Sequence, residues 1–291
     1  MKTLAEPQVS FKEILVASDL SAASVNATKY AKAIAKRFGS HIFLMHVGQP
    51  VNPSAIPKEE SFWDEAIREE QEAAAAGMAL REEGFSAGAV NVSGSIEDEI
   101  QVLAKKHQSD LIVLGTHGRG GQNWLVPRSQ AETIFRHSDR PVLIVGPSAA
   151  PAPEEWQPKS MLCATSLDLR GVKVVAFGYR LAQRVGAEFT VVLTSVHPGH
   201  EPSESEDEAL GFRDAVSKAL RESDMVLGQF RLLLGYDGAA VSIVEGARSV
   251  NADLIIMPAR NAPLTESDLS VGVLSQVLVD ARCPVLAIRV T

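Results

Sequence analysis

The chain has 291 residues, of which 45% are hydrophobic and 22% charged, and its formal net charge is −8. This composition is that of a globular protein, and the length is about twice that of a typical domain, so two domains are expected. The acidic balance argues against a general nucleic-acid surface, and no run approaches the ~20 apolar residues that span a bilayer. The start of the chain lacks the apolar block of a secretory signal. We therefore expect a cytoplasmic protein that binds neither nucleic acid nor membrane.

In the first half, short apolar runs alternate with helical patterns. The apolar runs cover residues 11–20, 41–47, 109–115 and 140–145. Ser21 or Ser24 can cap the first helix and Gly39 can end it, and a second helix, rich in Glu and Ala, is predicted over about 61–83. Because the runs are continuously apolar, they indicate parallel strands covered on both faces. The prediction is an α/β fold with a doubly wound parallel sheet of five strands and about four helices.

The second half repeats this order of elements. Asp110 and Asp253 lie 143 residues apart in the similar runs SDLIVLG and ADLIIMP, and the same interval separates Pro141 from Pro284. An acidic helical stretch at 204–227 corresponds to the one at 61–83. Two tandem copies are therefore predicted.

The two copies are expected to be domains at 10–147 and 157–291, joined by a semi-extended linker rich in Pro and Ala. The chain has two cysteines, Cys163 and Cys283, both inside apolar runs. Buried free thiols are therefore the expectation, rather than a disulfide or a metal site.

A glycine-rich loop follows the fourth strand. It reads GTHGRGG over residues 115–121, and a helix is predicted over 129–137. Glycines let backbone N–H groups approach an oxyanion closely, and a helix N-terminus adds partial positive charge, so the loop favours a bound phosphate. Taken alone, the same glycines fit an ordinary turn equally well.

Asp19, at the end of the first strand, is expected at the same sheet edge as the glycine loop. There it could accept hydrogen bonds from an adenine amino group or a ribose hydroxyl. Capping of the following helix is an equally good interpretation, and the two roles are compatible.

Together, Asp19, the run DLIVLGTHGRGG and the closing PVLIV resemble the universal stress protein family, once in each half. The resemblance implies an adenine nucleotide alpha hydrolase-like, HUP-type fold. The loop of the nucleotide-binding members has glycine, two residues, glycine, nine residues, then glycine and Ser or Thr. Gly115, Gly118 and Ser129 match this pattern, but Arg128 replaces the last glycine.

By this resemblance, the N-terminal domain binds ATP or a related adenine nucleotide, with or without Mg²⁺. The implied binding residues are Ala17, Asp19, Val47, Gly115, His117, Gly118, Arg119, Arg128, Ser129 and Gln130. The Arg128 side chain could block the approach of phosphate or replace the lost N–H contacts with a charge-assisted pair.

The second copy has lost this loop. Pro258, Asn261, Leu264 and Gly272 stand where the first copy has Gly115, Gly118, Gly121 and Ser129. Proline removes a donor and the added side chains block close approach, so this copy is predicted not to bind nucleotide in the same way. Family members dimerise through their last strands, which implies an internal pseudo-dimer of the two copies, with a homodimer as a further option.

Three classes of function compete: a nucleotide-binding switch, a scaffold without ligand, and an enzyme. The sequence has no GxxxxGK[ST] loop, no HExxH metal motif and no GxSxG elbow. We therefore expect a non-catalytic stress-response switch with at most weak ATP hydrolysis. The alternative is a nucleotide-independent structural or interaction scaffold of the same fold.

Overall fold

The computed structural model of the chain divides into two compact units, Phe11–Trp156 and one containing Gln157–Thr291. We treat each unit as a domain and describe it by itself. The described residues are 9–18, 22–47, 60–92, 94–116, 128–165, 169–194, 202–221, 228, 230–235, 238–258 and 272–289.

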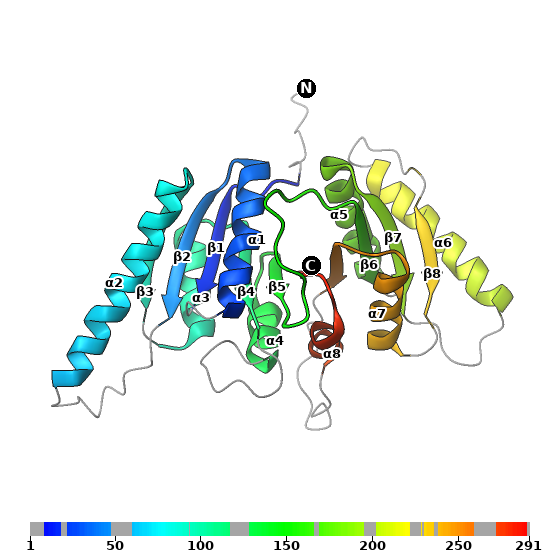
Figure 1. Ribbon diagram of the computed structural model, residues 1–291. Helices are drawn as coiled ribbons and strands as arrows, with labels where there is room; N and C mark the ends of the chain where they lie inside the picture. Colours follow the sequence, from blue (N-terminus) through cyan, green and yellow to red (C-terminus); the bar gives the residue numbers. More distant parts are fainter. Residues whose placement is uncertain are drawn as a thin grey trace. The chain divides into compact units, whose positions relative to one another are not determined.

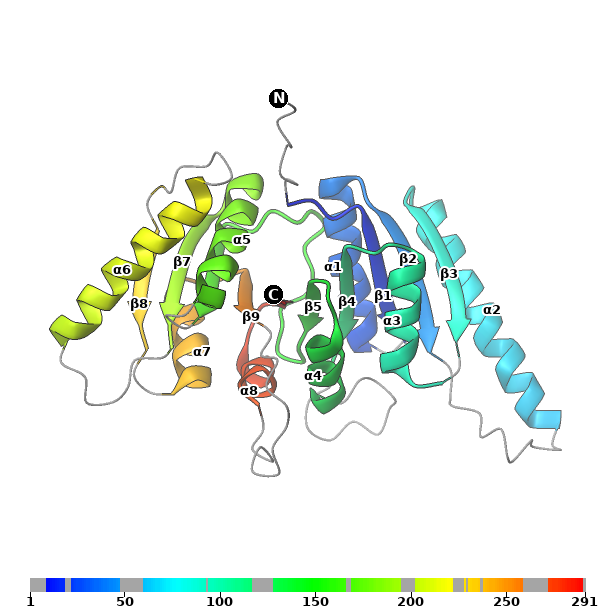
Figure 2. The same ribbon diagram turned by 180° about the vertical axis from the view of Figure 1, so that it is seen from behind.

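The N-terminal domain is a five-stranded parallel sheet covered by four helices in its described part. Its elements are β1 Glu13–Ser18, α1 Ala22–Phe38, β2 His41–Val47, α2 Glu60–Glu82, β3 Ser86–Val92, α3 Ile96–Lys106, β4 Leu111–Gly115, α4 Arg128–His137 and β5 Val142–Val145. The strand order is β3-β2-β1-β4-β5, and neighbouring strands pair in parallel. Figures 1 and 2 show α1 and α2 on one face and α3 and α4 on the other. The predicted doubly wound fold is confirmed.

The central strands are buried on both faces. Leu15 of β1, Ile112 of β4 and Leu143 of β5 are at most 1% exposed, because helices cover the sheet on each side. This burial explains the continuous apolar runs of the sequence. The third strand has no such run, and its residues are half-exposed or exposed because it lies at the sheet edge.

The first helix ends as predicted but does not begin as predicted. Gly39 has φ +64°, and the N–H groups of Gly39 and Ser40 donate to Ala35 O at 2.8 and 3.1 Å. Glycine suits this left-handed helix end because it has no Cβ. Ser24 cannot be the N-cap, since α1 starts at Ala22 and Ser24 is buried in its first turn. Ser21 lies outside the described residues.

The second domain repeats the architecture. Its described elements are β6 Ser160–Thr165, α5 Leu169–Val185, β7 Glu188–Leu193, α6 Pro202–Arg221, β8 Arg231–Leu234, α7 Ala239–Ser249, β9 Leu254–Pro258, α8 Val273–Asp280 and β10 Val285–Ile288. Read in the same direction as the first domain, its strand order is β8-β7-β6-β9-β10, so each strand takes the place of its counterpart. Gly186 ends α5 with φ +79°, as Gly39 ends α1.

The repeated aspartates are structural. Asp110 accepts hydrogen bonds from the N–H groups of Lys12 and Glu13 at 2.7 and 3.2 Å. Asp253 accepts from the N–H groups of Lys159 and Ser160 at 2.7 and 3.0 Å. Each carboxylate thus joins the amino ends of two neighbouring strands, which explains why the repeat is clearest there.

The segment between the domains packs against α1 rather than serving as a free spacer. Asn26 donates to Ala150 O at 3.3 Å and accepts from Ala152 N at 3.0 Å, while the Tyr30 hydroxyl donates to Ala150 O at 3.2 Å. Trp156 is buried beside Phe38, with ring centroids 6.1 Å apart. These contacts hold the linker along the N-terminal domain.

Both cysteines are free and buried, as predicted. Burial raises the pKa of the Cys163 thiol above its ordinary value and raises that of Cys283 to about 12. Neither thiol is a ready nucleophile, because the reactive form is the thiolate.

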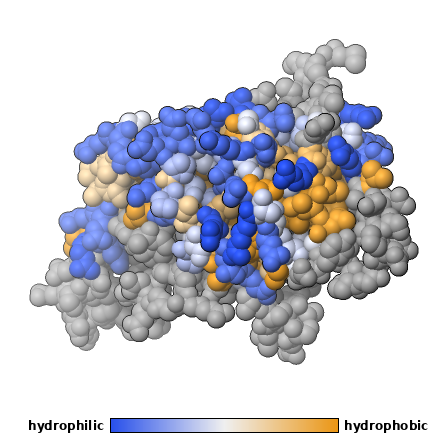
Figure 3. Space-filling model, turned by 45° about the vertical axis from the view of Figure 1, so that its right-hand side comes forward, coloured by the Kyte–Doolittle hydropathy of each residue, from blue (hydrophilic) through white to orange (hydrophobic). Residues whose placement is uncertain are grey.

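The face of the molecule drawn in Figure 3 is mainly polar in its described part. In Figure 3, hydrophilic residues cover most of the coloured surface, and hydrophobic residues form smaller groups between them. Large apolar side chains are exposed at Val25, Ile67, Met78, Val102, Leu210 and Val241. Single exposed apolar residues are normal on soluble domains and identify no docking surface. Among the described helices, none is long and apolar enough to cross a membrane.

Candidate functional site

The strand order of the N-terminal domain locates the candidate site. From β1 the chain moves outward through β2 to β3, then returns to β4 on the other side of β1 and continues to β5. The direction of winding therefore reverses between β1 and β4. In doubly wound sheets, ligands bind beyond the carboxyl ends of the strands at such a reversal.

Three of the residues implied by the resemblance lie at or next to the ends of neighbouring strands at this edge. Ala17, next to the end of β1, pairs with Leu114 of β4 and is 3% exposed. Gly115 is the last residue of β4 and Val47 the last residue of β2. The fold thus brings together residues that are up to 98 positions apart in the sequence.

Three more of these residues open a helix. Arg128, Ser129 and Gln130 are the first residues of α4, which therefore begins one residue before the predicted start. The N–H groups of a first helical turn have no partner within the helix and can bind an anion. The side chains of these three residues, and all of Asp19, His117, Gly118 and Arg119, lie outside the described part of the structure.

The structure adds a polar cluster that the sequence reasoning missed. His46 is 5% exposed, and its Nδ1 lies 3.0 Å from the carbonyl oxygen of Ser18. Because a carbonyl only accepts, Nδ1 carries the hydrogen of this bond. The Ser18 hydroxyl donates to Ser24 Oγ at 3.0 Å. In the sequence, the polar residue His46 near the end of the apolar run HIFLMHV was the feature that could have indicated this cluster.

A second missed residue is Thr116, directly after Gly115. It is 0% exposed, and its N–H donates to Val145 O at 3.0 Å. Its hydroxyl oxygen is buried without a hydrogen-bond partner. Thr116 is part of the GTHGRGG motif, but nothing in the sequence indicates that its side chain is buried.

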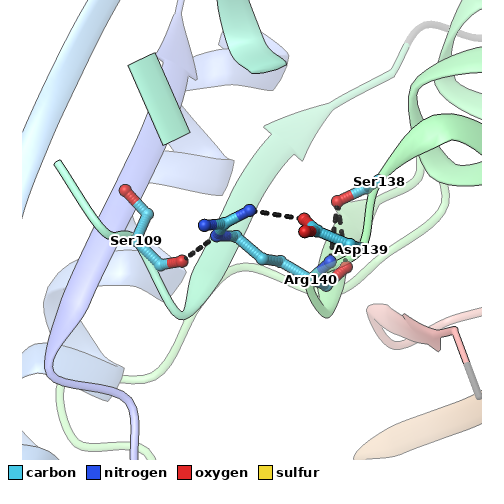
Figure 4. A network of polar contacts seen from close by, with 4 residues as sticks. All are labelled: Ser109, Ser138, Asp139 and Arg140. Carbon is cyan, nitrogen blue, oxygen red and sulfur yellow. Dashed lines mark hydrogen bonds and ion pairs between the residues drawn. The ribbon is translucent and has the colours of Figure 1, made fainter. Parts of the chain in front are cut away.

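The opposite edge of the sheet carries a structural network. Figure 4 shows the guanidinium of Arg140 between Ser109 and Asp139: Nε donates to the Ser109 carbonyl, and Nη1 contacts Asp139. Ser138 Oγ accepts from Arg140 N at 3.1 Å and donates to Arg140 O at 3.0 Å. These residues precede β4 and β5, so they join strand starts and lie away from the candidate site.

The corresponding edge of the second domain is built differently. Pro258 ends β9 where Gly115 ends β4, and it pairs with Ile288. Leu193 takes the place of His46, and Thr194 donates from its N–H to Thr165 O at 3.0 Å. Gly272 precedes α8 without a side-chain cap. Asn261 and Leu264 lie outside the described residues. At the strand ends, this edge therefore lacks the glycine and the histidine of the first domain.

The described residues hold no group of three or more His, Cys, Asp or Glu side chains that could bind a metal ion. The polar groups of the described carboxyl edge include hydroxyls, His46, the side chain of Asn91 next to the end of β3, and backbone groups. Such groups can hydrogen-bond a ligand.

Comparison with known proteins agrees with the fold and the repeat. The profile of the Universal stress protein family matches residues 10–146 and 158–289. A universal stress protein of Methanocaldococcus jannaschii is 33% identical over 140 residues, covering 46% of this chain and 82% of that protein. One from Thermus aquaticus is 34% identical over 143 residues, covering 46% of this chain and 98% of that protein.

Among solved structures, a universal stress protein from Archaeoglobus fulgidus covers 96% of this chain and 97% of its own, with a TM-score of 0.69 and 15% identity. At that identity the likeness concerns the fold. With two profile matches along one chain, two domains of the same strand order and the relatives above, this protein belongs to the universal stress protein family, as a member with two tandem domains.

Proposed function

We propose that the N-terminal domain binds ATP or a related adenine nucleotide at the carboxyl edge of its sheet, and that the protein is a non-catalytic stress-response switch. Nucleotide occupancy would shift a conformational or assembly equilibrium. The second domain would not bind nucleotide in this manner. The binding residues of the proposal are those implied by the family resemblance, with Ala17, Val47 and Gly115 at strand ends and Arg128 to Gln130 at the start of α4.

One observation carries the proposal: Gly115 ends β4 directly beside β1, at the point where the winding of the sheet reverses. A buried strand, a glycine loop and a helix start follow one another there, which is the arrangement that presents backbone N–H groups to a phosphate. The second domain keeps the winding but has Pro258 at this position.

The replacement of glycine by Arg128 is compatible with the proposal. Arg128 is the first residue of α4, and residues of an α-helix have right-handed helical backbone angles. An L-residue adopts such angles without strain, so glycine is not required there for its conformational freedom. A guanidinium near a phosphate also supplies donors of its own.

Two universal stress proteins of solved structure are complexes, one with cAMP and one, from Archaeoglobus fulgidus, with dAMP. They guide only the choice of probes, which are ATP, ADP, AMP and cAMP. Thermal unfolding is measured with each probe, and the acid-soluble fraction of freshly purified protein is assayed for adenine nucleotide. A probe at 100 times its dissociation constant stabilises the folded state by about 2.7 kcal/mol, a rise of roughly 5–10 °C for a domain of this size.

The matched variants are Gly118→Trp and Asn261→Trp, which place the same bulk at corresponding positions of the two loops. Only Gly118→Trp is expected to remove the thermal shift. If no probe stabilises the wild type and no nucleotide co-purifies, the scaffold without nucleotide becomes the better function. Loss of the shift in Asn261→Trp alone would place the site in the second domain. ATP turnover by the wild type that is abolished in Gly118→Trp would contradict the non-catalytic part.

A further inference from the structure

Thr116 has a hydroxyl that the fold does not use. The residue is fully buried, and its backbone N–H is satisfied by Val145 O, but Oγ1 is buried without a partner. Buried hydroxyls are nearly always hydrogen-bonded, because removing one from water without a new partner is costly. Because this orphaned hydroxyl lies at the carboxyl edge of a switch point, it is in a position to hydrogen-bond a ligand.

The direction of the Thr116 side chain follows from the strand pattern. The N–H of Ile112 donates to Pro141 O and the N–H of Thr116 to Val145 O, four residues further along both strands. The chain thus continues in register with β5 through Thr116, and its side chain lies on the same face as those of Ile112 and Leu114.

That face is the one occupied by Ala17. Leu114 pairs with Ala17 across β4 and β1, and paired residues of a sheet share a face. The family resemblance implies that Ala17 lies against the adenine base, and the proposed function uses the start of α4, twelve residues beyond Thr116 in the chain, for the phosphates. The hydroxyl is therefore on the nucleoside side of the site.

We propose that Thr116 Oγ1 is a hydrogen-bonding group for the nucleoside part, base or ribose, of the nucleotide bound by the N-terminal domain. The proposal rests on the proposed function and adds a residue that the family pattern of glycines and Ser129 does not include. A hydroxyl can donate and accept at once, so it suits the ring nitrogens and amino group of adenine and the ribose hydroxyls equally. The second domain has Ala259 at this position, and alanine offers no such group.

The test compares Thr116→Val, which keeps the shape but removes the hydroxyl, with Thr116→Ser, which keeps the hydroxyl. Affinities for adenosine, AMP and ATP are measured by titration calorimetry on the full chain. Thr116→Val should weaken all three about five- to tenfold, and by the same factor, because the nucleoside is common to them. Thr116→Ser should stay within about twofold of the wild type.

Thermal unfolding without ligand supplies an independent readout. Because the hydroxyl has no partner in the unliganded fold, Thr116→Val should melt at the wild-type temperature or above it. A clear loss of stability in this variant would show that the hydroxyl serves the fold, and would overturn the proposal.

The remaining outcomes distinguish failure of the Thr116 proposal from failure of the proposed nucleotide binding. A wild type that binds none of the three ligands refutes both. A wild type that binds them, with unchanged affinity in Thr116→Val, refutes only the role of Thr116. Weakened ATP binding with unchanged adenosine binding would assign the hydroxyl to the phosphates and also refute the proposal.

Discussion

The two repeated aspartates respond differently to the same substitution, because they use their oxygens differently. In the N-terminal domain, Asp110 accepts from Lys12 N with Oδ2 and from Glu13 N with Oδ1. In the second domain, Oδ2 of Asp253 accepts both bonds. Asparagine has only one acceptor oxygen, and its amide nitrogen donates.

The magnitudes follow from this count. Asp110→Asn must lose one bond and turn an NH₂ group towards a backbone N–H, at a cost of about 1–3 kcal/mol. Asp253→Asn can keep both bonds on its single oxygen and loses only the charge assistance, so we expect less than about 1 kcal/mol.

Urea unfolding followed by circular dichroism measures the total loss of stability, and hydrogen exchange over residues 11–18 and 157–165 assigns it to a domain. Exchange should accelerate in the first segment for Asp110→Asn and change little in the second for Asp253→Asn. Equal losses in the two variants, or a larger loss for Asp253→Asn, would refute the reasoning from oxygen usage.

Three further outcomes are expected. Gly39→Ala should destabilise the folded protein by about 1–2 kcal/mol, because Gly39 has φ +64°. Gly211→Ala lies in an open helical position and should stabilise it by about 0.5–1 kcal/mol. Equal effects of the two variants in urea unfolding would contradict the strain argument. Asn26→Ala should speed protease cleavage of the linker, since it removes two hydrogen bonds that hold the segment; an unchanged cleavage rate on gels would show that other contacts suffice. Cys163 should resist a thiol reagent until the protein unfolds, because burial raises the pKa of its thiol; stoichiometric labelling of the native chain would be inconsistent with this.

The pairing of the two domains through their last strands stays a prediction. Its test is a chain shortened by residues 157–291, which keeps the linker contacts of Ala150, Ala152 and Trp156 with the N-terminal domain. If the remaining N-terminal domain were monomeric and as stable as in the full chain, the second domain would not stabilise it. A fragment that is less stable or newly dimeric would support pairing, because an unpaired edge at β5 can form hydrogen bonds with a strand of another chain.

Most of the fold could be predicted from the sequence because the relevant rules are local or repetitive. Continuous apolar runs indicate strands covered on both sides, and Gly39 marks a helix end through its own backbone freedom. The half-exposed strand β3 was harder, since an edge strand has less need of a continuous apolar run. Ser24 was assigned as a possible cap because a single sequence does not show where the first turn of a helix begins.

The candidate site was only partly predictable. The glycine loop, and its loss in the second copy, could be identified from residue types, because the conformational freedom of glycine and the missing donor of proline are properties of the residues themselves. The burial of His46 and Thr116 could not be, because it depends on helices and strands distant in the chain.

By itself, then, the sequence determined that one α/β unit occurs twice and that only the first copy keeps a glycine-rich strand end. The tertiary structure decided which strands are neighbours. By placing β4 beside β1, it joined Ala17 to Leu114 and left the Thr116 hydroxyl buried without a partner at the same edge. The physical reason is that strand order and burial arise from contacts between segments about 100 residues apart, which residue types and local patterns do not encode individually.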